Sequence, residues 1–166
     1  MIDPKIQSAL NDHLQAELSS AYLYLAMAAH FEAANLQGSA QWMRRQAREE
    51  LGHAMKVFDY LADRNGRVEL KALPQPQGQF GSTLEVWKAA LANEEKVSKL
   101  IGDLSARARD AGDHATHAML QWFVTEQVEE EKTVQTILEQ VKQIGESSTA
   151  MFFLDRHLGK EAAESE

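Results

Sequence analysis

The sequence predicts an all-α protein, a four-helix bundle of two antiparallel hairpins joined by a long crossover, with a short fifth helix at its end. Apolar residues recur at alternating steps of four and three along four separate stretches, as expected of inward-facing helices. There are only three prolines, and two of them, Pro74 and Pro76, share one short segment, so long helices can run on both sides of it. The length of 166 residues suits one domain, and we expect a single domain over residues 1–166.

The first hairpin is expected to pair a helix over residues 4–35 with a second over residues 39–65. Asp3 is a good N-cap, and it precedes a proline in the first turn, where a missing N–H is tolerated. Ser39 can cap the second helix. Asn65-Gly66 then offers a left-handed stop, which is typical of a helix end.

The second hairpin is expected to pair helices over residues 83–111 and 113–144. Ser82 and Glu85, three residues apart, form a capping box for the third helix. Asp113 is placed to cap the fourth helix. Because the turn between these helices is short, they should pack antiparallel.

The connection over residues 66–82 has 17 residues, which is long for a link between helices. At about 3.3 Å per extended residue it can span the roughly 40 Å length of a 27-residue helix. The third helix can therefore start at the far end of the bundle and run parallel to the second. A fifth helix is expected over residues 148–158, and the acidic tail over residues 159–166 is expected to fray.

Each of the four apolar stripes carries a carboxylate or amide in its middle. A solvated helix face would explain the run Glu129-Glu130-Glu131, but it does not explain glutamates flanked by apolar residues one turn away on either side. Glutamate is almost never fully buried without a partner, and no Lys or Arg lies in these stripes. The stripe glutamates, one on each helix, are Glu17, Glu50, Glu94 and Glu130.

The spacing of these polar residues repeats along the chain. Glu17 and Glu50 are 33 residues apart, as are Glu94 and Gln127. The two hairpins therefore resemble copies related by a pseudo-two-fold axis, each supplying half of one site. A shift of 77 residues places Glu17 on Glu94, Glu49 on Glu126, Glu50 on Gln127 and His53 on Glu130.

This pattern predicts a site for two divalent cations. Residues three apart share a helix face, so Glu50 with His53, and Gln127 with Glu130, can converge on one point. Four buried carboxylates need protons or cations to neutralise them, and two divalent ions balance their charge. Oxygen-rich ligation with one imidazole favours iron or manganese. Two alternatives remain open: a core histidine without a metal, and a helical scaffold whose glutamates form a hydrogen-bonded polar layer.

With this spacing over four helices, the chain resembles a bacterial-type non-haem ferritin over nearly its whole length. The fifth helix resembles that family as well. The residues that carry the resemblance are Glu17, Tyr24, Glu49-Glu50-Leu51-Gly52-His53, Glu94 and Thr125-Glu126-Gln127-Val128-Glu129-Glu130-Glu131.

The resemblance implies a ferroxidase that oxidises Fe(II) with O2 or H2O2 and stores the ferric mineral in a cage of twenty-four identical subunits. It implies two irons per subunit bridged by Glu50, with Tyr24 beside the first and Gln127 beside the second. The implied ligands are Glu17, Glu50 and His53 for the first iron, and Glu50, Glu94 and Glu130 for the second. A third iron position is implied at Glu49, Glu126, Glu129 and Glu130.

Composition excludes several other classes of protein. The net charge of −8 argues against a nucleic-acid partner and favours a cationic substrate. Zero cysteines exclude disulfides, iron–sulfur clusters and thiol catalysis. No membrane span or signal-type segment is evident, so we expect a cytoplasmic protein. Haem is not expected, because Leu51 stands where the similar bacterioferritins carry a haem-binding methionine, and a second Glu-x-x-His motif is missing.

Overall fold

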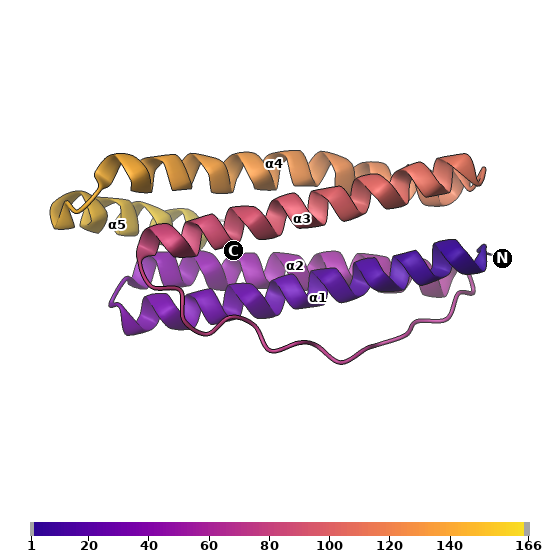
Figure 1. Ribbon diagram of the computed structural model, residues 1–166, viewed down its shortest axis with the longest axis horizontal. Helices are drawn as coiled ribbons and strands as arrows, with labels where there is room; N and C mark the ends of the chain where they lie inside the picture. The colour runs from indigo at the N-terminus through magenta and orange to yellow at the C-terminus, as the bar shows by residue number, and fades with distance from the viewer. Residues whose placement is uncertain (1, 165–166) are drawn as a thin grey trace.

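The computed structural model describes residues 2–164, and within that range the chain is entirely helical apart from its connections. α1 and α2 form one antiparallel hairpin and α3 and α4 the other, while α5 lies at one end of the bundle (Figure 1). The predicted all-α bundle is confirmed. The helices are α1 (Pro4–Ala33), α2 (Gln37–Asp63), α3 (Thr83–Asp110), α4 (His114–Ile144) and α5 (Ser148–Glu164).

The long connection between α2 and α3 runs along the outside of the bundle, beside α1, from one end to the other (Figure 1). α2 and α3 therefore point in the same direction, as the length of the connection predicted. Along this path the Asn11 amide donates to the backbone oxygen of Arg67 at 3.0 Å, and its side-chain oxygen accepts from the N–H of Glu69 at 2.7 Å. These bonds hold the start of the crossover against α1.

Most helix ends follow the sequence signals. The side chains of Asp3, Ser82 and Asp113 each accept a hydrogen bond from a backbone N–H of the following turn, at 2.8, 3.3 and 3.1 Å. Asn65 and Gly112 have φ values of 52° and 68° just beyond the ends of α2 and α3. These left-handed residues let the chain leave the helix directly into the next connection.

The start of α2 differs from the prediction, because Ser39 is not its N-cap. α2 begins at Gln37, and no side chain from the preceding residue caps it. The cap comes instead from α5, where Asp155 accepts from the N–H groups of Gly38 and Ser39 at 3.0 and 2.8 Å. Ser39 is buried at this crossing and donates its hydroxyl to the same carboxylate at 2.7 Å.

The predicted fraying over residues 159–166 is wrong for the part that is described, since α5 continues to Glu164. The reason is packing, because Leu158 and Ala162 are buried one turn apart on α5. Gly159 lies against Gly38 of α2, and a Cβ added to Gly38 would come within 1.7 Å of a backbone oxygen of α5. The last two residues of the expected tail, 165–166, lie outside the described residues.

Two apolar clusters fill the bundle, one on each side of a polar layer. The cluster nearer α5 contains Trp42 and Trp87, and the other contains Leu61 and Phe123. Both clusters combine residues from the two hairpins, so the hairpins are held together at each end. The polar layer between them is consequently kept at the middle of the bundle, away from solvent. Among the described helices, none has an apolar stretch that would allow it to cross a membrane.

Candidate metal centre

The four stripe glutamates are buried in the middle of the bundle. Glu17, Glu50, Glu94 and Glu130 have exposed fractions of 0, 1, 1 and 7%. Each is set on its helix between apolar residues that pack into one of the two clusters, so helix packing brings the carboxylates into one layer. His53 and Gln127 are buried in the same layer, with exposed fractions of 7 and 4%.

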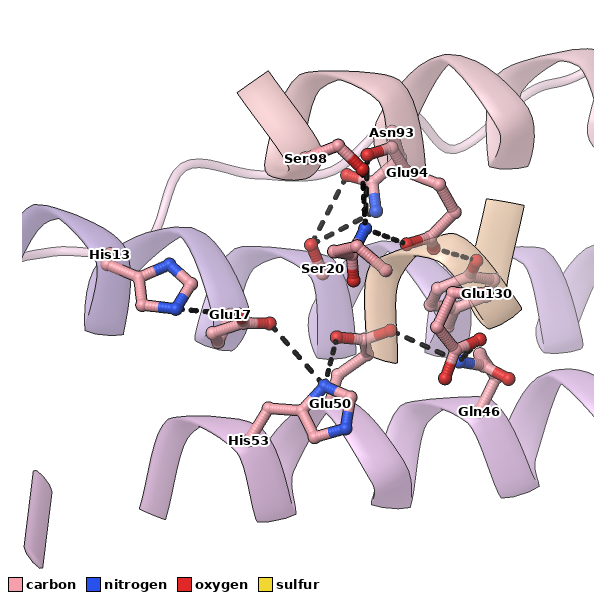
Figure 2. Close-up of polar contacts among 12 residues, drawn as sticks. His13, Glu17, Ser20, Gln46, Glu50, His53, Asn93, Glu94, Ser98 and Glu130 are labelled. Carbon is pink, nitrogen blue, oxygen red and sulfur yellow. Dashed lines mark hydrogen bonds and ion pairs between the residues drawn. The ribbon is translucent and has the colours of Figure 1, made fainter. Parts of the chain in front are cut away.

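Glu17, Glu50 and His53 form a group of candidate ligands whose side chains are all buried. Their ligand atoms all lie within 4.8 Å of one another. His53 Nδ1 is 3.4 Å from Glu50 Oε2 and 3.9 Å from Glu17 Oε2 (Figure 2). Two carboxylates and an imidazole at this separation can hold one cation between them.

Glu94 lies in the other half of the layer, where neutral groups bind it. The Tyr24 hydroxyl donates a hydrogen bond to Glu94 Oε1. Gln127 Nε2 lies 3.2 Å from Glu94 Oε2, and also 3.2 Å from the backbone oxygen of Glu94. Tyr24 was expected beside the first iron position. Its hydroxyl contacts Glu94, which the resemblance assigned to the second position.

Glu130 belongs to a second group, in which its ligand atom lies within 4.8 Å of those of His53 and Glu126. Gln46 joins this group to the first. Its Nε2 donates to Glu130 Oε2 at 2.8 Å and to Glu50 Oε1 at 3.2 Å. One amide on α2 thus connects carboxylates from both hairpins.

The three residues expected around a third iron position are placed differently from one another. Glu126 is half-buried and shares a group with His53 and Glu130. Glu49 has a 43% exposed side chain and lies 3.9 Å from Arg45 Nε. Glu129 is exposed and belongs to neither candidate group within residues 2–164. The structure therefore brings one of the three to the centre.

Burial and mutual repulsion shift the pKa values in the layer. Burial and the Glu50 charge raise the pKa of Glu94 to about 7, and burial with Glu50 and Glu94 raises that of Glu130 to about 8. Burial, reinforced by Glu50, also raises the pKa of Glu17 well above its usual range. Burial acts in the same direction on Glu50, but His53, together with Glu17 and Gln46, outweighs it and lowers the pKa of Glu50.

The imidazole of His53 responds in the opposite sense. Burial would lower its pKa, but the Glu50 carboxylate, together with those of Glu126 and Glu49, outweighs burial and raises it. The layer as a whole therefore retains protons that exposed carboxylates would lose. Cations that enter the layer can replace those protons, which is the behaviour of a metal-binding site.

Buried polar atoms without hydrogen bonds lie at the end of the layer that contains Glu17. Neither carboxylate oxygen of Glu17 makes a hydrogen bond with any residue in 2–164, and the same is true of His53 Nδ1. Buried polar atoms are nearly always bonded, so such atoms need an explanation. A cation bound by Glu17 and His53 would satisfy all three, and the donor set suits iron or manganese.

Sequence reasoning missed two residues in this layer, His13 and Gln46. His13 is fully buried, and its Nε2 lies 3.2 Å from Glu17 Oε1. Each of the two lies one turn before a stripe glutamate, His13 before Glu17 and Gln46 before Glu50. That spacing of four residues was the signal that could have identified them.

Comparisons with known proteins agree with this architecture. A family profile described as a ferritin-like domain matches residues 7–144. The chain is 36% identical to a bacterial non-heme ferritin of Staphylococcus haemolyticus and 35% identical to one of Staphylococcus aureus, covering 100% of both chains in each case.

Solved structures give the same result. An engineered closed form of the Archaeoglobus fulgidus ferritin superposes with a TM-score of 0.94 at 43% identity, covering 96% of this chain and 97% of that one. An open pore ferritin from the same archaeon gives 0.95 at 43% identity, with 96 and 98% coverage. By its sequence, its fold and the glutamates at its centre, this chain belongs to the ferritin family.

Proposed function

We propose that the protein stores iron, and that it oxidises Fe(II) with O2 or H2O2 at the centre within each subunit. Twenty-four copies would form a cage in the cytoplasm that holds the ferric mineral. Family membership and similarity to solved ferritins support iron storage. The buried group of Glu17, Glu50 and His53, in which both Glu17 oxygens and His53 Nδ1 lack hydrogen bonds to the described residues, carries the proposal of oxidation at this centre.

Each ligand has a role that follows from its position. Glu17 and His53 would hold the first Fe(II), and Glu94 and Glu130 the second. Glu50 would bridge them, because it lies 3.4 Å from His53 on one side and is linked to Glu130 through Gln46 on the other. Two Fe(II) ions supply the two electrons that reduce O2 to peroxide, and the hard carboxylate oxygens stabilise the Fe(III) that forms.

Three neutral side chains would support this centre without neutralising it. Gln127 and Tyr24 bind Glu94 and so orient its carboxylate toward the second iron. Gln46 does the same for Glu130. Glu126, beside His53 and Glu130, would accept iron that leaves the centre, and Glu49 and Glu129 would extend that third position.

An anaerobic Fe(II) titration of the apoprotein, followed by rapid mixing with O2, tests this function. We expect two irons per subunit to bind tightly and to be oxidised in a fast phase before slower mineral growth. His53→Ala and Glu94→Ala should each lose most of the fast phase. Glu95→Ala, which removes an exposed glutamate next to Glu94 on α3, should keep it. Fast oxidation at the parent rate in both His53→Ala and Glu94→Ala would refute the assignment.

A metal-free helical scaffold is the second candidate, and one observation favours it. Tyr24, Gln46 and Gln127 supply hydrogen bonds to Glu50, Glu94 and Glu130, so most of the layer has donors after all. Glu17 remains without one among the described residues. The scaffold predicts no tight iron in the same titration, which separates the two functions.

A further inference from the structure

A second imidazole, that of His13, faces the centre from α1. It lies one turn before Glu17, and Figure 2 shows it on the far side of Glu17 from His53. We propose that His13 is a positioning residue, whose Nε2–H holds Oε1 of Glu17 so that Oε2 is directed at the cation between His53 and Glu50. This inference rests on the function proposed above, because it assigns a role within the same centre.

The two oxygens of Glu17 face different imidazoles. Oε1 lies 3.2 Å from His13 Nε2, while Oε2 lies 3.9 Å from His53 Nδ1. The first pair is in contact but not aligned as a hydrogen bond. Rotation of the carboxylate about its terminal torsion, which is broad for glutamate, can align it. A carboxylate held at one oxygen presents the other in a fixed direction.

The surroundings of His13 give its imidazole no other role. His13 has an exposed fraction of 0%, and its ring packs edge-on against Phe123 with centroids 4.9 Å apart. Neither ring nitrogen forms a hydrogen bond within the described part of the chain. An apolar residue would fill this position without leaving two polar atoms buried. The contact with the Glu17 carboxylate is therefore the best account of why a histidine stands here.

His13 acts through Glu17 and does not itself bind the cation. Among the described residues, two groups of candidate ligand atoms lie within 4.8 Å of one another, and His13 belongs to neither. Partners that orient a ligand from outside in this way change metal affinity by about 10- to 100-fold when they are removed. The role of His13 should thus appear in the affinity of the first metal position.

Anaerobic titration of the assembled apoprotein with Co(II), followed by calorimetry and visible absorption, tests this role. His13→Leu fills the space without a donor, whereas His13→Gln places an amide N–H near the position of Nε2. We expect His13→Leu to weaken the tightest Co(II) position by about 10- to 100-fold. His13→Gln should retain the parent affinity and the parent Co(II) spectrum. His30→Leu, which removes an imidazole elsewhere on α1, is the matched control and should also bind as the parent does.

The Co(II) titrations distinguish a failure of the role of His13 from a failure of the proposed metal centre. Parent affinity in His13→Leu would overturn the role of His13 alone. Equal weakening in His13→Gln and His13→Leu would also overturn it, since a donor at the Nε2 position would then not suffice. If the parent protein itself bound no Co(II) tightly, the proposed metal centre would be refuted together with this role. Should His13→Leu fail to assemble, His13→Asn, whose shorter amide cannot reach as Nε2 does, provides the same comparison.

Discussion

Replacement of Glu130 by glutamine should remove a loss of folding stability that the apoprotein suffers as the pH rises. The folded state raises the pKa of Glu130 from 4.5 to about 8, through burial and the charges of Glu50 and Glu94. Between these two values the folded chain keeps a proton that the unfolded chain has lost. The resulting stabilisation is complete below pH 4.5 and is lost as the pH rises through 8. Glutamine is neutral at every pH and can still accept the hydrogen bond from Gln46.

The size of this loss of stability follows from the shift in the pKa of Glu130. Between pH 5.5 and 8.5 the parent should lose about 3 kcal/mol at this residue, at about 1.36 kcal/mol per pKa unit. Glu130 is 7% exposed, so solvent screens the interaction little. For a chain of this length, each kcal/mol moves Tm by about 2–4 °C, which predicts a change of roughly 6–12 °C.

Thermal melts of chelator-treated protein at pH 5.5, 7.0 and 8.5 measure the difference. The Tm of Glu130→Gln should rise relative to the parent as the pH increases. Glu129→Gln, which alters the exposed neighbouring glutamate, should leave the difference from the parent constant. A Tm difference between Glu130→Gln and parent that does not change with pH would show that Glu130 is not held protonated by the buried layer.

Three further changes test α5 and the asymmetry of the centre. Asp155→Ala removes the cap of α2 and should cost about 1–2 kcal/mol, measured by chemical denaturation; unchanged stability would show that the cap is not needed. Gly38→Ala should displace α5 and expose it to limited proteolysis, whereas Gly102→Ala, which meets nothing within 4 Å, should be as resistant as the parent. The double change Gln127→Glu with Glu130→His restores a symmetric pair of motifs and should retain iron, so a second Fe(II) addition hours later should recover less fast oxidation than in the parent. Equal recovery would show that these two ligands do not decide whether iron leaves.

The sequence alone was sufficient for the bundle and for the glutamates of its central layer. Burial of a helix stripe depends on local periodicity, so a glutamate such as Glu17 or Glu94, flanked by apolar residues at steps of three and four, had to face the core. Helix ends at Asp3, Ser82 and Asp113 are equally local, because each cap involves only the following turn. The crossover could be predicted from its length.

Contacts between helices were decided only by the tertiary structure. A rotation or slide of a helix by a fraction of its 5.4 Å pitch changes which side chains meet, and no periodicity encodes that register. The contact of Tyr24 with Glu94, and the bridge by Gln46 between Glu50 and Glu130, depend on such a register. His13 is a different case, because its contact with Glu17 lies within α1 at a spacing of four residues, which the sequence alone could have indicated.

The C-terminal helix shows most clearly what the sequence alone could not predict. Residues after 158 contain several charges and few large apolar groups, so the sequence alone favours fraying. The close approach of Gly159 to Gly38, and the cap that Asp155 supplies to α2, stabilise the helix as far as Glu164. These contacts join residues more than 100 positions apart. Local sequence determined which residues could form helices and which faces they would bury, whereas packing between distant segments decided where α5 ends and which groups meet at the centre.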